Sequence, residues 1–258
     1  MNIVVCVKQV PDTTVTKTID PSRLRLEREV QAVPNPFDEY AVEEALRLVE
    51  KHGGSVVAIC VGAPQAQDAL RRVFAMGVER GILVSDPALA GSDTLGTARA
   101  LAAALHGEPF DLVICGQQST DATTGVVPAR LAALLGLPQV THARKVALEG
   151  QRLAVERQSD EGSLLVEVPL PALVSVVKGI NEPRYPSLRG IMAAKKKEIK
   201  QLDLAALGLA GSEVGVAGAR TRVVALASAP ARQAGTVRKA EGKGGVLIAD
   251  FLEKARLI

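Results

Sequence analysis

The chain has 258 residues, of which 47% are hydrophobic and 23% charged, a composition typical of a globular protein with a full core. Its 31 Lys and Arg residues nearly balance 28 Asp and Glu residues, and only 2% of residues are aromatic, so we expect a protein partner and no nucleic acid. No apolar run approaches the roughly 18 residues of a membrane span, and Met1 leads directly into a strand, so we expect a cytoplasmic protein that is not embedded in a membrane.

The first half of the chain predicts alternating buried strands and helices. Short apolar runs typical of parallel strands cover residues 2–8, 55–62, 81–85 and 112–115. Helical spacing follows over 38–51, 65–76, 94–106 and 126–135, with Asn35 as a candidate N-cap of the first helix. Residues 15–33 alternate as a short surface hairpin does. This β-α repeat predicts an α/β fold with a Rossmann-like, mostly parallel sheet and helices on both faces.

The pattern changes after residue 137. Residues 140–148, 152–158 and 164–170 alternate between apolar and polar side chains and predict an antiparallel addition to the sheet, followed by a buried strand over 172–177. A turn-rich loop with a short helix is expected over 178–200, a flexible stretch over 208–218 and one more strand over 221–227. We expect a nucleotide-binding domain over 1–228 and a C-terminal extension over 229–258, whose linker carries an amphipathic helix, 246–257, that packs on a partner subunit.

The stretch 111–136 predicts a strand, a polar loop and a helix. The loop gathers side-chain donors and acceptors, namely Gln117, Gln118, Ser119, Thr120, Asp121, Thr123 and Thr124. Gly116 and Gly125 would let a ligand approach the backbone. A loop that opens a helix at the carboxyl end of a parallel strand offers free backbone N–H groups and the positive end of the helix dipole, which favour a phosphate. We therefore expect a nucleotide, with a helix cap formed by Asp121 or Thr124 as the alternative.

No residues suggest a catalytic centre. Cys6, Cys60 and Cys115 each lie in an apolar strand pattern, which predicts buried thiols rather than a metal or disulfide set. The three histidines form no cluster, and the G-x-S-x-G, H-E-x-x-H and G-x-x-x-x-G-K-[ST] patterns are absent. A nucleotide-hydrolysing or adenylating α/β enzyme remains an alternative, but the residues after the first strand lack the Ser/Gly-rich pyrophosphate loop it needs.

Residues 181–197 combine apolar and basic side chains. Tyr185, Leu188, Ile191 and Met192 lie among arginines and lysines, a make-up typical of an interaction surface. Prolines and a glycine disfavour regular structure around Leu188, so we expect this side chain to be exposed. The alternative is a packed loop with a solvated lysine end.

Taken together, several stretches resemble the beta (small) subunit of electron transfer flavoprotein over nearly the whole chain. They are VVCVKQVPD, NPFDEYAVEEAL, AMGVERGI, VERQSDEG, PALVS and, most specific, NEPRYPSLRGIMAAKKK. The resemblance implies a non-catalytic electron carrier that pairs with an alpha subunit, shares one FAD with it and holds an AMP. It implies electron flow from acyl-CoA and similar dehydrogenases of fatty acid beta-oxidation to a quinone oxidoreductase. A bifurcating variety, with a second FAD and NADH in place of AMP, is the alternative.

The resemblance also implies which residues lie at the ligands. For AMP they are Cys6, Asn35, Pro36, Phe37, Asp38, Ala58, Cys60, Gly116, Gln117, Gln118, Ser119, Thr120, Asp121, Thr123, Thr124, Gly125, Val126 and Val127. Thr13 and Phe37 are implied to lie nearest the FAD. The surface that docks the dehydrogenase is implied to consist of Tyr185, Pro186, Ser187, Leu188, Arg189, Gly190, Ile191 and Met192.

Four positions depart from the family pattern. Many relatives have an aromatic residue where Thr13 stands, an acidic residue at Gln158, and Glu or Gln at Leu164. The first departure weakens direct flavin stacking, and the second removes a charge proposed to steer the mobile flavin domain. The loop also lacks the Gln that commonly follows the glycine at Gly125, although its backbone N–H groups remain available for a phosphate.

Overall fold

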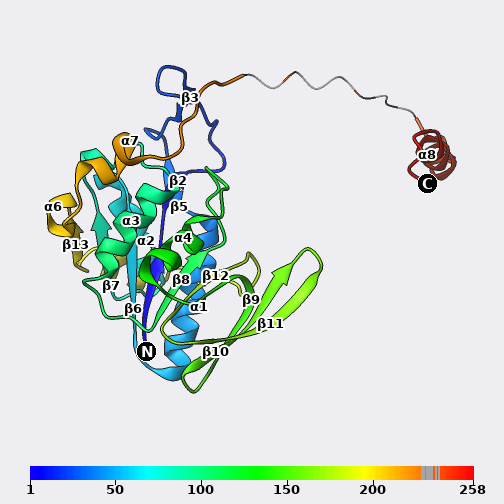
Figure 1. Cartoon of the computed structure of the whole chain (residues 1–258). Helices are drawn as coiled ribbons and strands as arrows, with labels where there is room; N and C mark the ends of the chain where they lie inside the picture. Colours follow the sequence, from blue (N-terminus) through cyan, green and yellow to red (C-terminus); the bar gives the residue numbers. More distant parts are fainter. Residues whose placement is uncertain (228–229, 231–234, 236, 238) are drawn as a thin grey trace. The chain divides into compact units, whose positions relative to one another are not determined.

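A computed structural model of the chain describes residues 1–227, 230, 235, 237 and 239–258 (Figure 1). The chain divides into two units, Met1–Val224 and Ala225–Ile258. The second unit contains helix α8 (Gly244–Lys254), so a helix is present where the sequence predicts one. The predicted linker, 229–245, falls partly on residues outside the described ones. The domain boundary at residue 228 and the packing of α8 on a partner stay predictions.

A nine-stranded sheet lies at the centre of the first unit, in the order β11-β10-β9-β12-β8-β1-β6-β7-β13. Parallel pairing joins β9 (Gln139–Glu149), β12 (Ala172–Val176), β8 (Leu112–Gly116), β1 (Asn2–Cys6), β6 (Ser55–Val61), β7 (Arg80–Val84) and β13 (Ile199–Leu202). β10 (Arg152–Ser159) and β11 (Gly162–Pro169) add to β9 in antiparallel fashion. The mostly parallel sheet with an antiparallel addition is confirmed.

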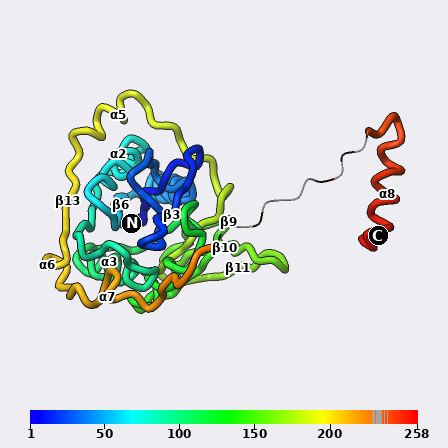
Figure 2. The backbone as a smooth tube through the Cα atoms, turned by 90° about the horizontal axis from the view of Figure 1, so that it is seen from above, coloured from blue at the N-terminus to red at the C-terminus, as the bar shows by residue number. Residues whose placement is uncertain are grey.

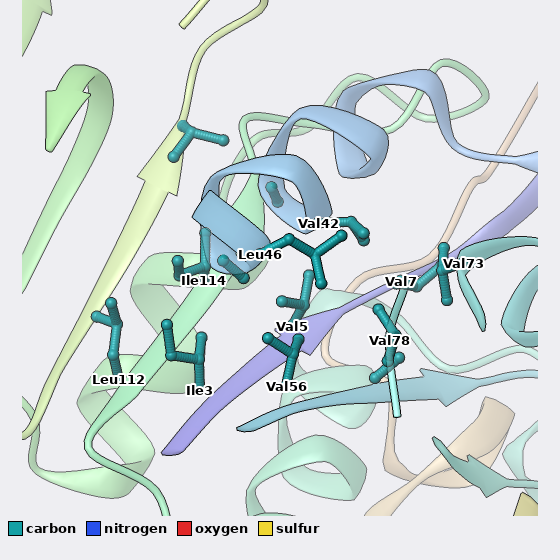
Figure 3. Packing of buried hydrophobic residues seen from close by; sticks show 14 of the residues in the cluster. Ile3, Val5, Val7, Val42, Leu46, Val56, Val73, Val78, Leu112 and Ile114 are labelled. Atoms are coloured by element: carbon teal, nitrogen blue, oxygen red, sulfur yellow. The ribbon is translucent and has the colours of Figure 1, made fainter. Parts of the chain in front are cut away.

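Successive residues of each central strand face opposite sides of the sheet. Because these residues are apolar on both sides, helices cover both faces. On one face, α1 (Pro36–His52) packs on β1, and α2 (Gln67–Met76) packs on β6 and β7; Ile3 and Val5 of β1 belong to the core on this face. Figure 3 shows Val42 and Leu46 of α1 directed at this face of β1 and β8. On the other face, α3 (Thr94–Leu105) and α4 (Val127–Leu135) pack on Val4 of β1 and its neighbours. Figure 2 shows α2 and α5 (Leu188–Ala194) on one side of the unit and α3 on the other.

Short elements complete the first unit. A two-stranded ribbon joins β2 (Gln9–Pro11) to β5 (Ala32–Pro34), and the expected hairpin is present as β3 (Ile19–Asp20) and β4 (Arg25–Leu26). Single turns are η1 (Pro64–Ala66), η2 (Pro87–Leu89), α6 (Leu204–Leu207), η3 (Gly211–Glu213) and α7 (Gly215–Gly218). None of the helices that the structure describes has the length and apolar character needed to cross a membrane.

Two predictions on the last part of the first unit are wrong. Residues 221–227 form no strand, because the edge beside β7 is already occupied by β13, which the sequence did not predict. Val223, Val224 and Leu226 are exposed instead. The stretch 208–218 is not simply flexible, since it contains η3 and α7 and buries Val214 completely.

Candidate nucleotide site

The crossovers of the sheet define one position where a ligand fits between helices. From β1 the chain runs through α1 and α2 toward β7, with both helices on one face. It then returns through α3, on the other face, to β8 on the opposite side of β1. Strand order thus reverses between β1 and β8, and the carboxyl ends of the strands beside such a reversal border a crevice. Cys6 and Cys115 are register partners at this edge.

Asn35 connects the two loops that border this crevice. Its side-chain Nδ2 donates to Gln118 O at 2.8 Å and to Asp38 Oδ1 at 2.8 Å, and its Oδ1 accepts from Thr120 N at 3.2 Å. Asn35 occupies the N-cap position of α1, as predicted, but its side chain makes no capping hydrogen bond to the backbone of the helix. Because both ends of this buried amide are used across the crevice, Asn35 holds the start of α1 against the loop after β8.

Asp38 lies beneath this contact with its carboxylate buried. Its Oδ2 accepts from the Lys8 backbone N–H at 2.8 Å, and its Oδ1 accepts from Asn35. Burial raises the pKa of Asp38 to about 7, because the two hydrogen bonds and the Lys8 charge only partly offset the loss of water. Asp38 therefore changes its charge near neutral pH, directly beside the crevice.

Asp121 is held in the loop by cations from two other segments. Its side chain has no exposed surface, and its carboxylate contacts Lys8 Nζ at 2.8 Å and Arg28. Burial opposes ionisation, but the Lys8 charge and the hydrogen bonds from Lys8, Ser119 and Arg28 together outweigh it and hold the pKa of Asp121 well below its usual range. Lys8 Nζ also donates to Ser119 Oγ at 3.2 Å, and Lys17 Nζ donates to Thr120 O at 3.0 Å. The loop thus gathers three cations.

The helix-cap alternative for this loop is wrong. Helix α4 begins after Val126, and no side chain caps its amino end. Thr123 N donates to Ser119 O at 2.9 Å, so this N–H is already used. Among the described residues, the N–H groups of 124–127 have no acceptor. The Thr120 hydroxyl is buried and also lacks a partner there. Unsatisfied donors at a helix amino terminus, next to cations, can bind an anion.

The two glycines of the loop have different roles. A Cβ on Gly116 would lie 2.4 Å from Asp38 Oδ1 and 2.7 Å from the Phe37 backbone carbon, so the chain itself requires this glycine. This close packing explains the glycine by itself, and the approach of a ligand to Gly116 stays a prediction. Gly125 instead has a left-handed φ of +64°, with its nearest Cβ contact at an ordinary 3.6 Å. Its backbone conformation, rather than space, favours glycine here.

The other residues implied for the ligands lie around this edge. Ala58 and Cys60 have completely buried side chains on β6, and β1 lies between this strand and β8, which leads into the loop. Cys60 and Cys115 are buried free thiols, as predicted, and Cys6 is half-buried. Thr13 is exposed and Phe37 is half-buried. Thr13 lines a hollow of ≈ 390 Å³ together with Gln9, Pro36 and Arg72.

A second hollow, of ≈ 270 Å³, lies beyond β8. It is lined by Gln117, His142, Gln158, Ser159, Asp160, Val177 and Lys178. His142 has a left-handed φ of +61° where β9 shifts register against β12, and its N–H donates to Ser175 Oγ at 3.1 Å. The sequence patterns predicted no role at the site for His142, Lys8 or Arg28. Of these three residues, only Lys8 could have been recognised as a site candidate, because it follows the carboxyl end of β1.

The apolar side chains of residues 185–192 point to solvent. Tyr185 is 91% exposed, Leu188 82% and Met192 66%, so the expected exposure of Leu188 is confirmed for this chain. The short helix expected within 178–200 is present as α5, and Leu188 is its first residue, although no regular structure was expected around this position. The N-cap residue Ser187 accepts from Gly190 N at 3.0 Å. The lysine end is not fully solvated either, because Lys197 is half-buried and donates to Val78 O at 2.6 Å.

Fold and site together define a doubly wound α/β protein with a polar loop, rich in N–H groups without an acceptor among the described residues, at the point where its strand order reverses. Comparison with known proteins adds the family. The model of the electron transfer flavoprotein domain matches residues 24–207. The electron transfer flavoprotein subunit beta of Mycobacterium bovis is 44% identical over 264 residues, covering 100% of this chain and 99% of that protein. The chain belongs to the electron transfer flavoprotein family, as a beta subunit.

Two other relatives show how broad this similarity is. The electron transfer flavoprotein subunit beta of Thermoanaerobacterium thermosaccharolyticum is 44% identical and aligns with 92% of each chain. Subunit CarD of the caffeyl-CoA reductase-Etf complex of Acetobacterium woodii is 38% identical, over 91% of this chain and 90% of its own length. Relatives from complexes with different names therefore align with more than nine tenths of this chain.

Proposed function

We propose that this chain is the small subunit of a heterodimeric electron transfer flavoprotein and holds AMP in the crevice between β1 and β8. An alpha subunit holds most of a shared FAD, and electrons pass from acyl-CoA or similar dehydrogenases through this FAD to a quinone oxidoreductase. The chain has no catalytic residue of its own in this role. The observation that carries the nucleotide proposal is the run of N–H groups over 124–127, which have no acceptor among the described residues.

These N–H groups and the Thr124 hydroxyl would bind the phosphate, with the α4 dipole adding to the attraction. Thr123 N–H is excluded from this role, because it donates to Ser119 O. Asp121 would stabilise the loop without meeting the phosphate. A carboxylate beside a phosphate repels it unless cations intervene, and Lys8 and Arg28 already neutralise this one.

The FAD supplies the redox chemistry when bound. Of this chain, Thr13 and Phe37 would lie nearest to it, beside the hollow that Thr13 lines. A threonine offers no ring for stacking on a flavin, so any aromatic contact from these two residues would come from Phe37. The exposed residues 185–192 would dock the dehydrogenase, with Leu188 as the anchor.

The identity of the nucleotide decides between two members of the family. The chain is 38% identical to a subunit of the caffeyl-CoA reductase-Etf complex, which favours a bifurcating-type subunit with a second FAD as the second candidate. The heterodimer should be purified with its alpha subunit and denatured, and the released ligands should be identified by mass spectrometry. AMP and FAD in equal amounts support the proposal, whereas FAD at twice the protein with no AMP supports the bifurcating candidate. A preparation without flavin and without adenine nucleotide would contradict both.

Gly125→Val is expected to empty the nucleotide site. A β-branched residue at a φ of +64° costs about 1–2 kcal/mol, and relaxing this strain would reorient the N–H groups over 124–127. Gly150→Val is a matched control, because Gly150 has the same φ of +64° in the turn between β9 and β10, far from the crevice. AMP per heterodimer should fall several-fold in the first variant and stay unchanged in the second. Equal AMP content in both variants would show that the loop has another task.

Asp121→Asn is expected to cost stability and nucleotide together. The substitution removes the charge that faces Lys8 and Arg28, and about 2–3 kcal/mol should be lost, less than for a fully buried pair because both cations are partly exposed. Glu108→Gln is the control, since Glu108 is similarly buried and also pairs with one arginine and one lysine, Arg80 and Lys200. Urea unfolding should show a comparable loss in both variants. AMP retained in Asp121→Asn at the level of the control would argue against a loop-stabilising role at the site.

A further inference from the structure

The base of the docking surface, residues 185–192, is attached to helix α1 through a buried carboxylate. The Glu43 side chain is only 4% exposed. It accepts from Arg184 Nε at 2.8 Å, from the Arg184 backbone N–H at 3.2 Å and from Arg47 Nε at 2.7 Å. Glu50, one to two turns further along α1, accepts from the same guanidinium at 3.0 Å. A buried carboxylate is tolerated only when its oxygens are satisfied, and Arg184 supplies most of the donors here.

A second side chain fixes the same end of the segment. Asn181 Nδ2 donates to Tyr40 O at 3.0 Å and to Glu44 Oε2 at 3.0 Å. Both acceptors belong to α1, within one turn of Glu43. The contacts of Asn181 and Arg184 therefore hold the chain against α1 directly before the exposed Tyr185.

The other end of the segment is attached to α2. Arg71 donates to Ala194 O at 2.7 Å, and Lys197 Nζ donates to Val78 O just after the helix. Gly190 packs so closely that a Cβ there would lie 2.5 Å from Ala75 O. The exposed apolar side chains are thus carried on a short helix whose two ends are both bound to the core helices.

Helix α1 also borders the nucleotide crevice, because Phe37 and Asp38 lie in its first turn. Glu43 follows Asp38 by five residues, or about 8 Å along the helix axis. We infer that Glu43 and Arg184 are positioning residues, which hold the docking surface ordered and at a fixed place relative to the crevice. The inference rests on the proposed function, because it takes residues 185–192 as the surface that meets a dehydrogenase. An ordered surface loses less conformational entropy when a partner binds.

Arg184→Gln in the heterodimer tests this inference, with Arg80→Gln as the matched control. Each arginine is partly exposed and pairs with a buried glutamate that keeps a second cation, Arg47 for Glu43 and Lys200 for Glu108. With a purified acyl-CoA dehydrogenase as electron donor, Arg184→Gln should raise the KM for the heterodimer about three- to tenfold and leave kcat unchanged. Hydrogen exchange of the Gly190 and Ile191 amides, which both donate to Ser187, should become faster. The control should change neither quantity.

Combination with Leu188→Ala separates this inference from the docking proposal. If positioning acts through the docking surface, Arg184→Gln should add less than twofold to the KM in a Leu188→Ala background. A full additional effect in that background, or an unchanged KM for Arg184→Gln while Leu188→Ala raises it, would overturn the positioning role. A KM unchanged by Leu188→Ala alone would instead overturn the docking surface. Arg184→Lys keeps the charge but not the forked geometry, so recovery of the wild-type KM in this variant would also contradict the inference.

Discussion

The contribution of Asp38 to the free energy of unfolding is expected to fall as pH rises from about 4 to about 7. Burial raises the pKa of Asp38 from its usual 3.8 to about 7 in the folded chain. Between these values the folded state binds more protons than the unfolded state, so stability is present at the acid end and is lost as pH rises. A shift of this size corresponds to up to about 4 kcal/mol.

Asp38→Asn isolates this contribution. The side-chain oxygen of the introduced Asn can accept from one of the two donors, the Lys8 N–H or Asn35 Nδ2. Its NH2 group then faces the other donor, which costs about 1–3 kcal/mol of stability at low pH. The wild-type chain should therefore be more stable than the variant at pH 5, and its advantage should shrink or reverse by pH 8. Urea unfolding across this range measures the difference. An advantage that stays constant from pH 5 to pH 8 would instead show that Asp38 is ionised throughout this range, with both of its oxygens satisfied by their donors.

The Asp38 charge also concerns the proposed nucleotide site. Below the pKa of Asp38, its carboxyl group is neutral, so the cations around Asp121 have no second carboxylate charge beside them. AMP affinity should therefore weaken as pH rises past about 7, since the newly ionised carboxylate repels the phosphate through a partly desolvated region. Asp111→Asn is a useful control, because Asp111 also accepts a backbone N–H, from Asn2 at 2.7 Å, but at the other end of the sheet.

The central strands were predictable because burial on both faces leaves a continuous apolar run. Leu112 to Cys115 and the apolar residues of β1 show it directly, and their β-α order limits the fold to a doubly wound sheet. Edge strands give no such signal. β13 reads IKQL and is only partly buried, so its pairing with β7 could not be seen in its residues. The apolar stretch 221–227 looked more like a strand, yet no open edge was left for it.

The loop after β8 was predictable in its chemistry but not in its contacts. Its polar side chains and Gly125 follow a buried strand, and that position alone predicts an anion site. The cations that hold Asp121 are 113 and 93 residues away in the chain, so only the folded structure brings Lys8 and Arg28 to it. The same holds for Gly116, whose close neighbours, Phe37 and Asp38 at the start of α1, lie far from it in the sequence. The local sequence pattern predicts which chemical groups a segment presents, whereas residues distant in the sequence determine which contacts these groups make.

Leu188→Ala is expected to weaken dehydrogenase docking by one to two powers of ten without changing the protein itself. A leucine that is 82% exposed and then enters an apolar pocket contributes about 1.5–3 kcal/mol to binding. Because this side chain is mostly exposed in the free chain, its removal should change the free energy of unfolding by less than about 0.5 kcal/mol. A core leucine would instead cost about 2–5 kcal/mol, which the observed exposure argues against.

The control for this variant is Leu165→Ala, since Leu165 is 78% exposed on the edge strand β11. Both heterodimers should keep their flavin, AMP and melting temperature. Only Leu188→Ala should raise the KM for the heterodimer as acceptor of an acyl-CoA dehydrogenase, with kcat unchanged because Leu188 lies outside the residues proposed to lie at AMP and FAD. Ionic strength should alter this difference little, because the lost contribution is apolar. An equal KM for the two leucine variants, or a melting temperature lowered in Leu188→Ala alone, would show that Leu188 does not act as an anchor.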